Sequence, residues 1–109
     1  MRLSLSLNKL TSVKGLEKLT QLEKLSLRAN QLTDVKGLEK LTKLTSLRLY
    51  NNKLTDVKGL EKLAQLTKLD LEHNPALTKA QIAELQKALP KCYISSNYNS
   101  GSPEPKTAP

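Results

Sequence analysis

The sequence predicts an α/β fold: a right-handed solenoid with short parallel strands on its concave face, 3₁₀ or short helical turns on its convex face, and a C-terminal capping helix. Three observations lead to this prediction. Leucines recur at a constant spacing in the frame L-x-x-L-x-L-x-x-N-x-L, most completely at 22–32 and 44–54. The segment Val-Lys-Gly-Leu-Glu-Lys-Leu occurs three times at the same spacing. Hydrophobic content is 38% with no Phe or Trp, which suits a solenoid whose repeats bury aliphatic side chains against their neighbours.

Residues 1–10 already show a strand pattern, because they are a partial copy of the leucine frame. Solenoids usually begin with a polar capping segment, because an end strand otherwise exposes leucines and unpaired backbone groups. No such segment is recognisable here. We therefore expect either a fragment of a longer array or an edge that a partner covers, including a second copy of the chain.

The repeated seven-residue segment predicts a tight turn on the convex face. In the second copy, Val35, Leu38 and Leu41 fall at i, i+3 and i+6, a spacing that fits a 3₁₀ helix. Gly37 lowers helix propensity, so a long helix is not expected. A residue suited to accept from free backbone N–H groups precedes each copy: Ser12, Asp34 and Asp56. The close identity of the copies indicates recent duplication or consensus design.

An asparagine ends the strand frame in every copy and predicts a ladder of buried amides: Asn8, Asn30, Asn52 and Asn74. Each amide should satisfy backbone groups that would otherwise be buried without hydrogen-bond partners. We assign these asparagines a structural role and no part in ligand binding.

Residues 77–89 depart from the repeat and predict a true helix. Thr78 and Gln81 form a T-x-x-Q capping box, and Pro90 ends the helix. A slightly longer spacing then predicts a last strand, in which the places of Leu66, Leu69, Leu71 and Asn74 are taken by Leu89, Cys92, Ile94 and Asn97. The predicted organisation is repeats at 1–74, a capping repeat at 75–97 and a polar, disordered tail at 98–109.

The formal charge of +8 taken alone suggests anionic partners, namely nucleic acid, an anionic membrane surface or an acidic protein. The preferred interpretation is that the repeat multiplies a solvated face, since Lys36 and Lys40 flank Glu39 and the next copy repeats the arrangement. Aromatic interleaving and known motifs for nucleic acid are lacking, so no specific nucleic acid is predicted. Weak electrostatic binding to a polyanion remains an alternative.

A single cysteine, the lack of a signal peptide and the lack of an apolar run of membrane-spanning length favour a soluble protein in a reducing compartment such as the cytoplasm.

Side chains between the inward leucines form three columns on the concave face. The columns are Arg2, Lys24, Ser46, Lys68; then Ser4, Ser26, Arg48, Asp70; then Ser6, Arg28, Tyr50, Glu72. Packing requires none of them, and they differ most between copies, which predicts a ligand-binding face. Tyr50 is the aromatic anchor of the kind that often dominates interfaces. The alternative is a solvated surface with internal ion pairs such as Arg48–Asp70.

Catalysis is not predicted. His73 is the only histidine and lies beside an asparagine turn, and Cys92 is expected to be a buried small hydrophobic residue with no base near it. Asp70 and Glu72 supply too few oxygen ligands for Ca²⁺. We therefore expect no cofactor and no metal.

The repeats resemble the 22-residue class of leucine-rich repeats, as in bacterial internalins and the leucine-rich regulatory subunit of protein phosphatase 1. The match rests on the frame at 22–32 and 44–54 and on T-D-V-x-G-L-x-x-L at 33–41 and 55–63, and it covers roughly residues 3–97. The closing Leu-Thr-Lys-Ala-Gln-Ile…Leu-Pro-Lys-Cys looks like the ends of bacterial members. The resemblance implies binding of a protein, of unknown identity, on the concave strand face.

Overall fold

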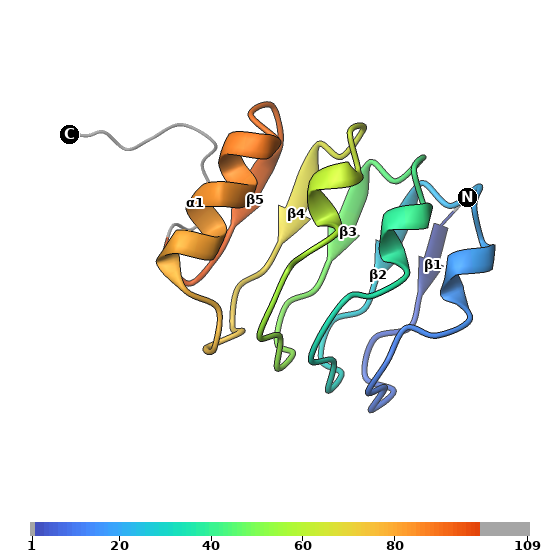
Figure 1. Ribbon diagram of the computed structural model, residues 1–109. Coiled ribbons are helices and arrows are strands. Elements are labelled where there is room, and N and C mark those ends of the chain that lie inside the picture. Colours follow the sequence, from blue (N-terminus) through green and yellow to red (C-terminus); the bar gives the residue numbers. More distant parts are fainter. Residues whose placement is uncertain (1, 99–109) are drawn as a thin grey trace.

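The computed structural model describes residues 2–98 as one parallel sheet in the order β1-β2-β3-β4-β5 (Figure 1). The strands are β1 (Arg2–Ser4), β2 (Lys24–Ser26), β3 (Ser46–Arg48), β4 (Lys68–Asp70) and β5 (Tyr93–Ser95). Three 3₁₀ turns, η1 (Leu16–Lys18), η2 (Leu38–Lys40) and η3 (Leu60–Lys62), and helix α1 (Lys79–Ala88) lie in a row along one side of the sheet (Figure 1). The predicted solenoid is therefore confirmed.

The core is a stack of leucines at equivalent positions of successive repeats. Leu25 is the register partner of Leu47, and Leu47 of Leu69, and all three are buried. The strands are too short to be stable alone, so their stability comes from this stacking between neighbours. In the first repeat, the corresponding Leu3 and Leu5 are only partly buried.

The repeated seven-residue segment forms the predicted 3₁₀ turn. The N–H of Leu38 donates to the carbonyl of Val35 (3.0 Å), and that of Leu41 donates to the carbonyl of Leu38 (2.9 Å). Gly37 has φ 103°, a left-handed conformation that glycine adopts at little cost. Its N–H donates to Oε1 of Glu39 at 2.9 Å, so the glutamate side chain of the segment bonds to the glycine of the same segment.

The residue before each copy accepts a backbone hydrogen bond, but not from the 3₁₀ turn. Asp34 Oδ1 accepts from the N–H of Lys36 at 3.1 Å, which closes a local turn. The 3₁₀ helix begins only after Gly37, and no side chain caps it. The prediction of a helix cap at Asp34 was wrong, because the left-handed glycine separates the two turns.

Buried asparagines join successive repeats through both atoms of their amides. Asn52 Oδ1 accepts from the N–H of Leu32 (3.0 Å), and its Nδ2 donates to the carbonyls of Leu27 (3.0 Å) and Leu49 (3.1 Å). Asn30 and Asn74 make the equivalent bonds. The prediction of a buried amide at Asn8 was wrong: this side chain lies beside the edge strand β1, is exposed, and donates to the carbonyl of Ser6 (3.3 Å). Each amide thus satisfies backbone groups of its own repeat and of the one before it.

The last repeat begins with α1 as predicted, and its capping box is present. The N–H of Gln81 donates to Thr78 Oγ1 (3.1 Å), and the N–H of Thr78 donates to Gln81 Oε1 (2.8 Å). The predicted register beyond the helix was wrong. The register partner of Leu69 is Ile94, whereas the sequence frame placed Cys92 there.

Cys92 precedes β5 and occupies the place of Leu66, since its N–H donates to the carbonyl of Leu89 as that of Leu66 donates to Leu63. α1 therefore lengthens the last repeat more than the sequence suggested. The burial predicted for Cys92 is confirmed.

Asn97 does not take the buried place of Asn74. It is exposed, and its amide bonds to the N–H of His73 (2.7 Å) and the carbonyl of Asn74 (3.0 Å). Tyr98, predicted to begin the disordered tail, is anchored by a hydrogen bond from its hydroxyl to the carbonyl of Leu77 (2.8 Å). The rest of that predicted tail, 99–109, lies outside the described residues.

Candidate functional site

The strand register aligns the predicted columns across the sheet. Within the first column, Lys24 is the partner of Ser46, and Ser46 of Lys68. Within the second, Ser26 is the partner of Arg48, and Arg48 of Asp70. The third column lies just beyond the strand ends, where backbone bonds continue the alignment of Arg28, Tyr50 and Glu72. The chain thus presents three parallel rows of side chains that alternate with the buried leucines.

The columns are exposed or half-buried. Lys24, Arg28, Arg48 and Lys68 are exposed, while Ser26, Ser46, Tyr50, Asp70 and Glu72 are half-buried. The carboxylate of Asp70 accepts from the N–H of Glu72 (3.1 Å) and from the hydroxyl of Ser95 (3.5 Å). The Asp70 carboxylate therefore bonds to the end of its own strand and to a side chain of β5. Its register partner on the other side is Arg48 of β3.

Three side chains from successive repeats form a row of contacts that includes two members of the third column, Arg28 and Tyr50, together with His73. The guanidinium of Arg28 lies over the Tyr50 ring, and the His73 ring lies on a tilt against the same ring. The sequence predicted Tyr50 as part of this face but not His73, which was placed only beside an asparagine turn. His73 has φ 61°, like Asn51 one repeat earlier. The only signal in the sequence was that His73 directly follows Glu72, the member of the third column in its repeat.

Two hollows lie over the strands on this face. The larger, of about 630 Å³, lies over β1 to β4, and the smaller, of about 290 Å³, lies between β3 and β5. Tyr93 and Ser95 of β5 line the smaller hollow. Tyr93 extends the first column and Ser95 the second column by one strand. They were not predicted from the sequence, because the register predicted for the last repeat was wrong.

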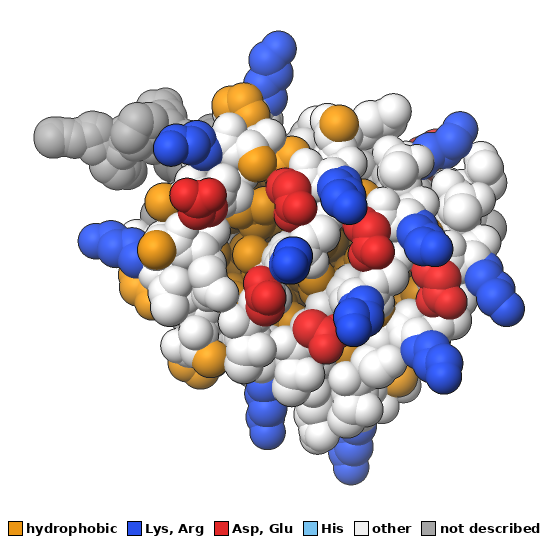
Figure 2. Space-filling model, in the orientation of Figure 1, with side chains coloured by type: hydrophobic (Ala, Val, Ile, Leu, Met, Phe, Trp, Pro, Cys, Tyr) orange, Lys and Arg blue, Asp and Glu red, His pale blue; other side chains and the backbone are white. Residues whose placement is uncertain are grey.

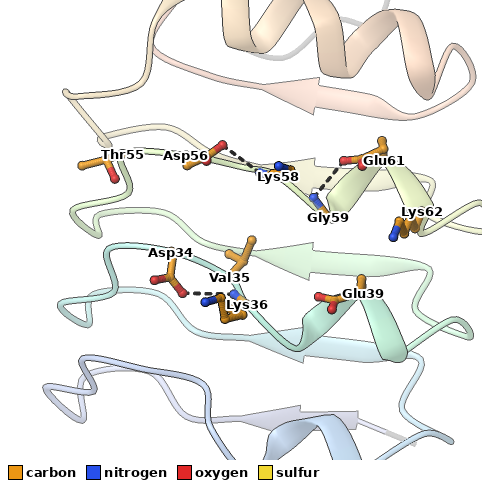
Figure 3. Close-up of a pocket in the computed structure, with 10 residues that line it drawn as sticks. All are labelled: Asp34, Val35, Lys36, Glu39, Thr55, Asp56, Lys58, Gly59, Glu61 and Lys62. Atoms are coloured by element: carbon orange, nitrogen blue, oxygen red, sulfur yellow. Dashed lines mark hydrogen bonds between the residues drawn. The ribbon is translucent and has the colours of Figure 1, made fainter.

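The convex face carries its own groove, of about 530 Å³, between the second and third copies of the repeated segment (Figure 3). Its polar side chains bond within their own turns. Asp56 accepts from the N–H of Lys58 (3.0 Å) and Glu61 from that of Gly59 (2.8 Å). Acidic and basic side chains are interspersed over this face (Figure 2), so we regard it as the structural side of the solenoid.

No group of three or more His, Cys, Asp or Glu side chains that could hold a metal ion exists within residues 2–98. Cys92 is buried in the core, whereas His73 is exposed. Burial raises the pKa of the Cys92 thiol to about 11, which opposes use as a nucleophile. The helix of the described part, α1, is too short and polar to cross a bilayer.

Comparison with known proteins gives a consistent result. A family model described as leucine-rich repeats (2 copies) matches residues 2–41 and 42–87. No curated protein matches the sequence. Among solved structures, a leucine-rich repeat protein of Leptospira interrogans is 39% identical with a TM-score of 0.79, over 87% of this chain and 25% of that one. An internalin of Listeria monocytogenes is 34% identical with a TM-score of 0.75, over 90% of this chain and 27% of that one. The chain thus spans about a quarter of each of these proteins.

Proposed function

Because the chain belongs to the leucine-rich repeat family, we propose that it is a non-enzymatic protein–protein interaction module that binds a protein ligand on its concave strand face. Repeats of this family typically form interaction modules, and solenoids use their concave surfaces for binding. One observation carries the proposal. The convex segment is identical in three copies, whereas the columns over β2 to β4 hold a different residue at almost every position.

The proposed binding face consists of the three columns over β2, β3 and β4: Lys24, Ser26, Arg28, Ser46, Arg48, Tyr50, Lys68, Asp70 and Glu72. None of these side chains belongs to the hydrophobic core. Their identities are therefore free to serve recognition without a cost to packing. Tyr50 offers the large, half-buried aromatic surface that interfaces commonly use as an anchor.

The test is selection of binders from a displayed library of random twelve-residue peptides. Selected peptides are then assayed against three proteins: the wild type, the concave variant Arg48→Ala/Tyr50→Ala and the convex variant Lys36→Ala/Lys58→Ala. The proposal expects most peptides to lose at least about tenfold in affinity for the concave variant and less than about twofold for the convex one. The proposal would be contradicted if the peptides bound the concave variant with unchanged affinity, or if the selection yielded no binders.

A second candidate is self-association through the edge strand β1, and the burial of the first repeat favours it. Leu3, Leu5, Leu10 and Leu16 are only partly buried, whereas their equivalents in the next repeat are fully buried. β1 also has a neighbour on one side only. Light scattering after size exclusion tests this candidate: a mass that stays monomeric from micromolar to millimolar concentration argues against it.

A further inference from the structure

The larger hollow on the concave face is lined by charges of one sign. Its charged residues are all cations: Arg2, Lys24, Arg28, Arg48 and Lys68. Four serines also line the hollow: Ser4, Ser6, Ser26 and Ser46. The hydroxyls of Ser6 and Ser26 are hydrogen-bonded to each other (3.0 Å). Guanidinium groups, ammonium groups and hydroxyls are all hydrogen-bond donors, so this hollow is chemically suited to oxyanions.

The strand register places two of these cations directly opposite each other on neighbouring strands. Arg2 on β1 is the direct partner of Lys24 on β2, and like charges directly opposite in a sheet are destabilising. On the convex face, by contrast, Lys36 and Lys40 alternate with Glu39, and Figure 2 shows the same mixing over the other turns. The excess positive charge of the concave hollow is therefore not a by-product of the duplicated segment. An anionic ligand would relieve the repulsion.

The same face becomes acidic toward the C-terminal end. Asp70 and Glu72 follow Arg48 and Tyr50 in their columns. The part of the face that carries cations and no carboxylate spans β1 to β3, about 10 Å at the usual spacing of strands. This length fits about three extended residues. A long polyanion that continued along the columns would meet Asp70 and Glu72, so the charge pattern favours a short anionic stretch within a protein.

We propose that the hollow binds a short segment of the partner protein rich in Asp and Glu, which lies across β1 to β3 with its carboxylates on Lys24, Arg28 and Arg48. This inference rests on the proposed function and adds the chemical class of the ligand. The acidic residues at the other end, Asp70 and Glu72, fix the direction of the segment, since its acidic part is repelled from them.

Fluorescence anisotropy with defined peptides tests the inference. The probe is a labelled peptide with five consecutive glutamates between Gly-Ser flanks, and its control has five glutamines. The concave variant is Lys24→Ser/Arg48→Ser, and the matched convex variant, with the same loss of charge, is Lys36→Ser/Lys58→Ser. Ser46 and Ser26 already occupy the columns of Lys24 and Arg48, so the concave variant should fold.

We expect the glutamate peptide to bind at least about tenfold more tightly than the glutamine peptide, and to weaken as added salt screens the charges. The concave variant should lose about five- to twentyfold in affinity and the convex variant less than about twofold. No binding at millimolar protein, or equal losses in both variants, would overturn the inference. So would a 15-nucleotide single-stranded DNA that binds the wild type more tightly than the peptide, with the same dependence on Lys24 and Arg48.

The peptide selection above separates the two proposals. Selected peptides that require the concave face and are enriched in Asp and Glu support both. Selected peptides that require the concave face but show no acidic enrichment overturn the inference and leave the proposed function standing. Selected peptides that do not require the concave face would contradict both the proposed function and the inference.

Discussion

The guanidinium carbon of Arg28 lies 5.3 Å from the centroid of the Tyr50 ring, and the His73 ring centroid lies 4.8 Å from the same point at an interplanar angle of 57°. Tyr50 is thus contacted by a residue of the preceding repeat and by one of the following repeat. These contacts restrict the ring in the free protein, so a ligand of the proposed concave site would lose less entropy on binding there.

The first prediction concerns this contact. In a double-mutant cycle of Arg28→Ser and Tyr50→Ser, we expect a coupling free energy of about 0.5–1 kcal/mol, as for an exposed cation–π pair. Urea unfolding of the four proteins measures it. A coupling free energy within error of zero would show that the two side chains contribute independently to stability.

The second prediction compares two asparagines. Asn52→Ala leaves the buried N–H of Leu32 without its partner. It also removes one of the two amide bonds at each of the carbonyls of Leu27 and Leu49, which keep their bonds from Asn30 and Asn74. We expect a loss of about 1–3 kcal/mol in the free energy of unfolding. Asn8→Ala is the control, because its exposed amide donates to the carbonyl of Ser6 at 3.3 Å. Equal destabilisation of the two variants would argue against a structural role for the buried bonds.

The third prediction tests the register of the central strand. Leu47 is 0% exposed on β3, so Leu47→Ala should cost about 2–5 kcal/mol of stability through the lost burial and the cavity left behind. Ser46→Ala, one residue earlier on the concave face, should change stability by less than about 0.5 kcal/mol. Thermal unfolding followed by circular dichroism measures both. A larger effect at Ser46 would reverse the assignment of the two faces.

The fourth prediction concerns acid. Hydrogen bonds from the backbone N–H groups of Glu39 and Gly37 hold the pKa of the Glu39 carboxyl below its usual value of 4.5. A lowered folded-state pKa stabilises the fold above about 4.5, and this contribution is lost as pH falls through the folded value. The melting temperature of Glu39→Gln should therefore fall less between pH 6 and pH 3 than that of the wild type.

The control for this acid effect is Glu84→Gln, which removes an exposed carboxylate from α1. Its melting temperature should follow the wild-type pH dependence. If Glu84→Gln flattened the curve as much as Glu39→Gln, general charge repulsion rather than the bond to Gly37 would explain the acid response.

The fifth prediction uses Cys92 as a reporter of the last repeat. Burial raises the pKa of its thiol from 9.0 to about 11, which lowers the thiolate fraction near neutral pH by about a hundredfold. Iodoacetamide should therefore label the folded protein at least about a hundredfold more slowly than the urea-unfolded protein. Leu85→Ala, which removes a buried side chain of α1, should speed the labelling. Equal rates for folded and unfolded protein would place Cys92 at the surface.

The sequence predicted the regular repeats well, because their constant spacing determines both the register and the burial of residues such as Leu25 and Leu47. It failed where this spacing ends. Leu89, Cys92, Ile94 and Asn97 match the spacing of the leucine frame. However, α1 occupies more chain than a 3₁₀ turn and moves the strand further along, so that Ile94 takes the place expected for Cys92. The ring contact of His73 was also hidden, because it depends on a left-handed backbone angle that the sequence alone does not show.

The pairing of Gly59 with its neighbours has a consequence for how such a chain changes over generations. A Cβ on Gly59 would lie 3.3 Å from Oε1 of Glu39, a residue of the preceding repeat, and its φ of 104° already disfavours any side chain. A substitution in one copy is thus constrained by a different copy. The side chains of the concave columns are not subject to this constraint. They can therefore differ between repeats while the convex segments stay identical.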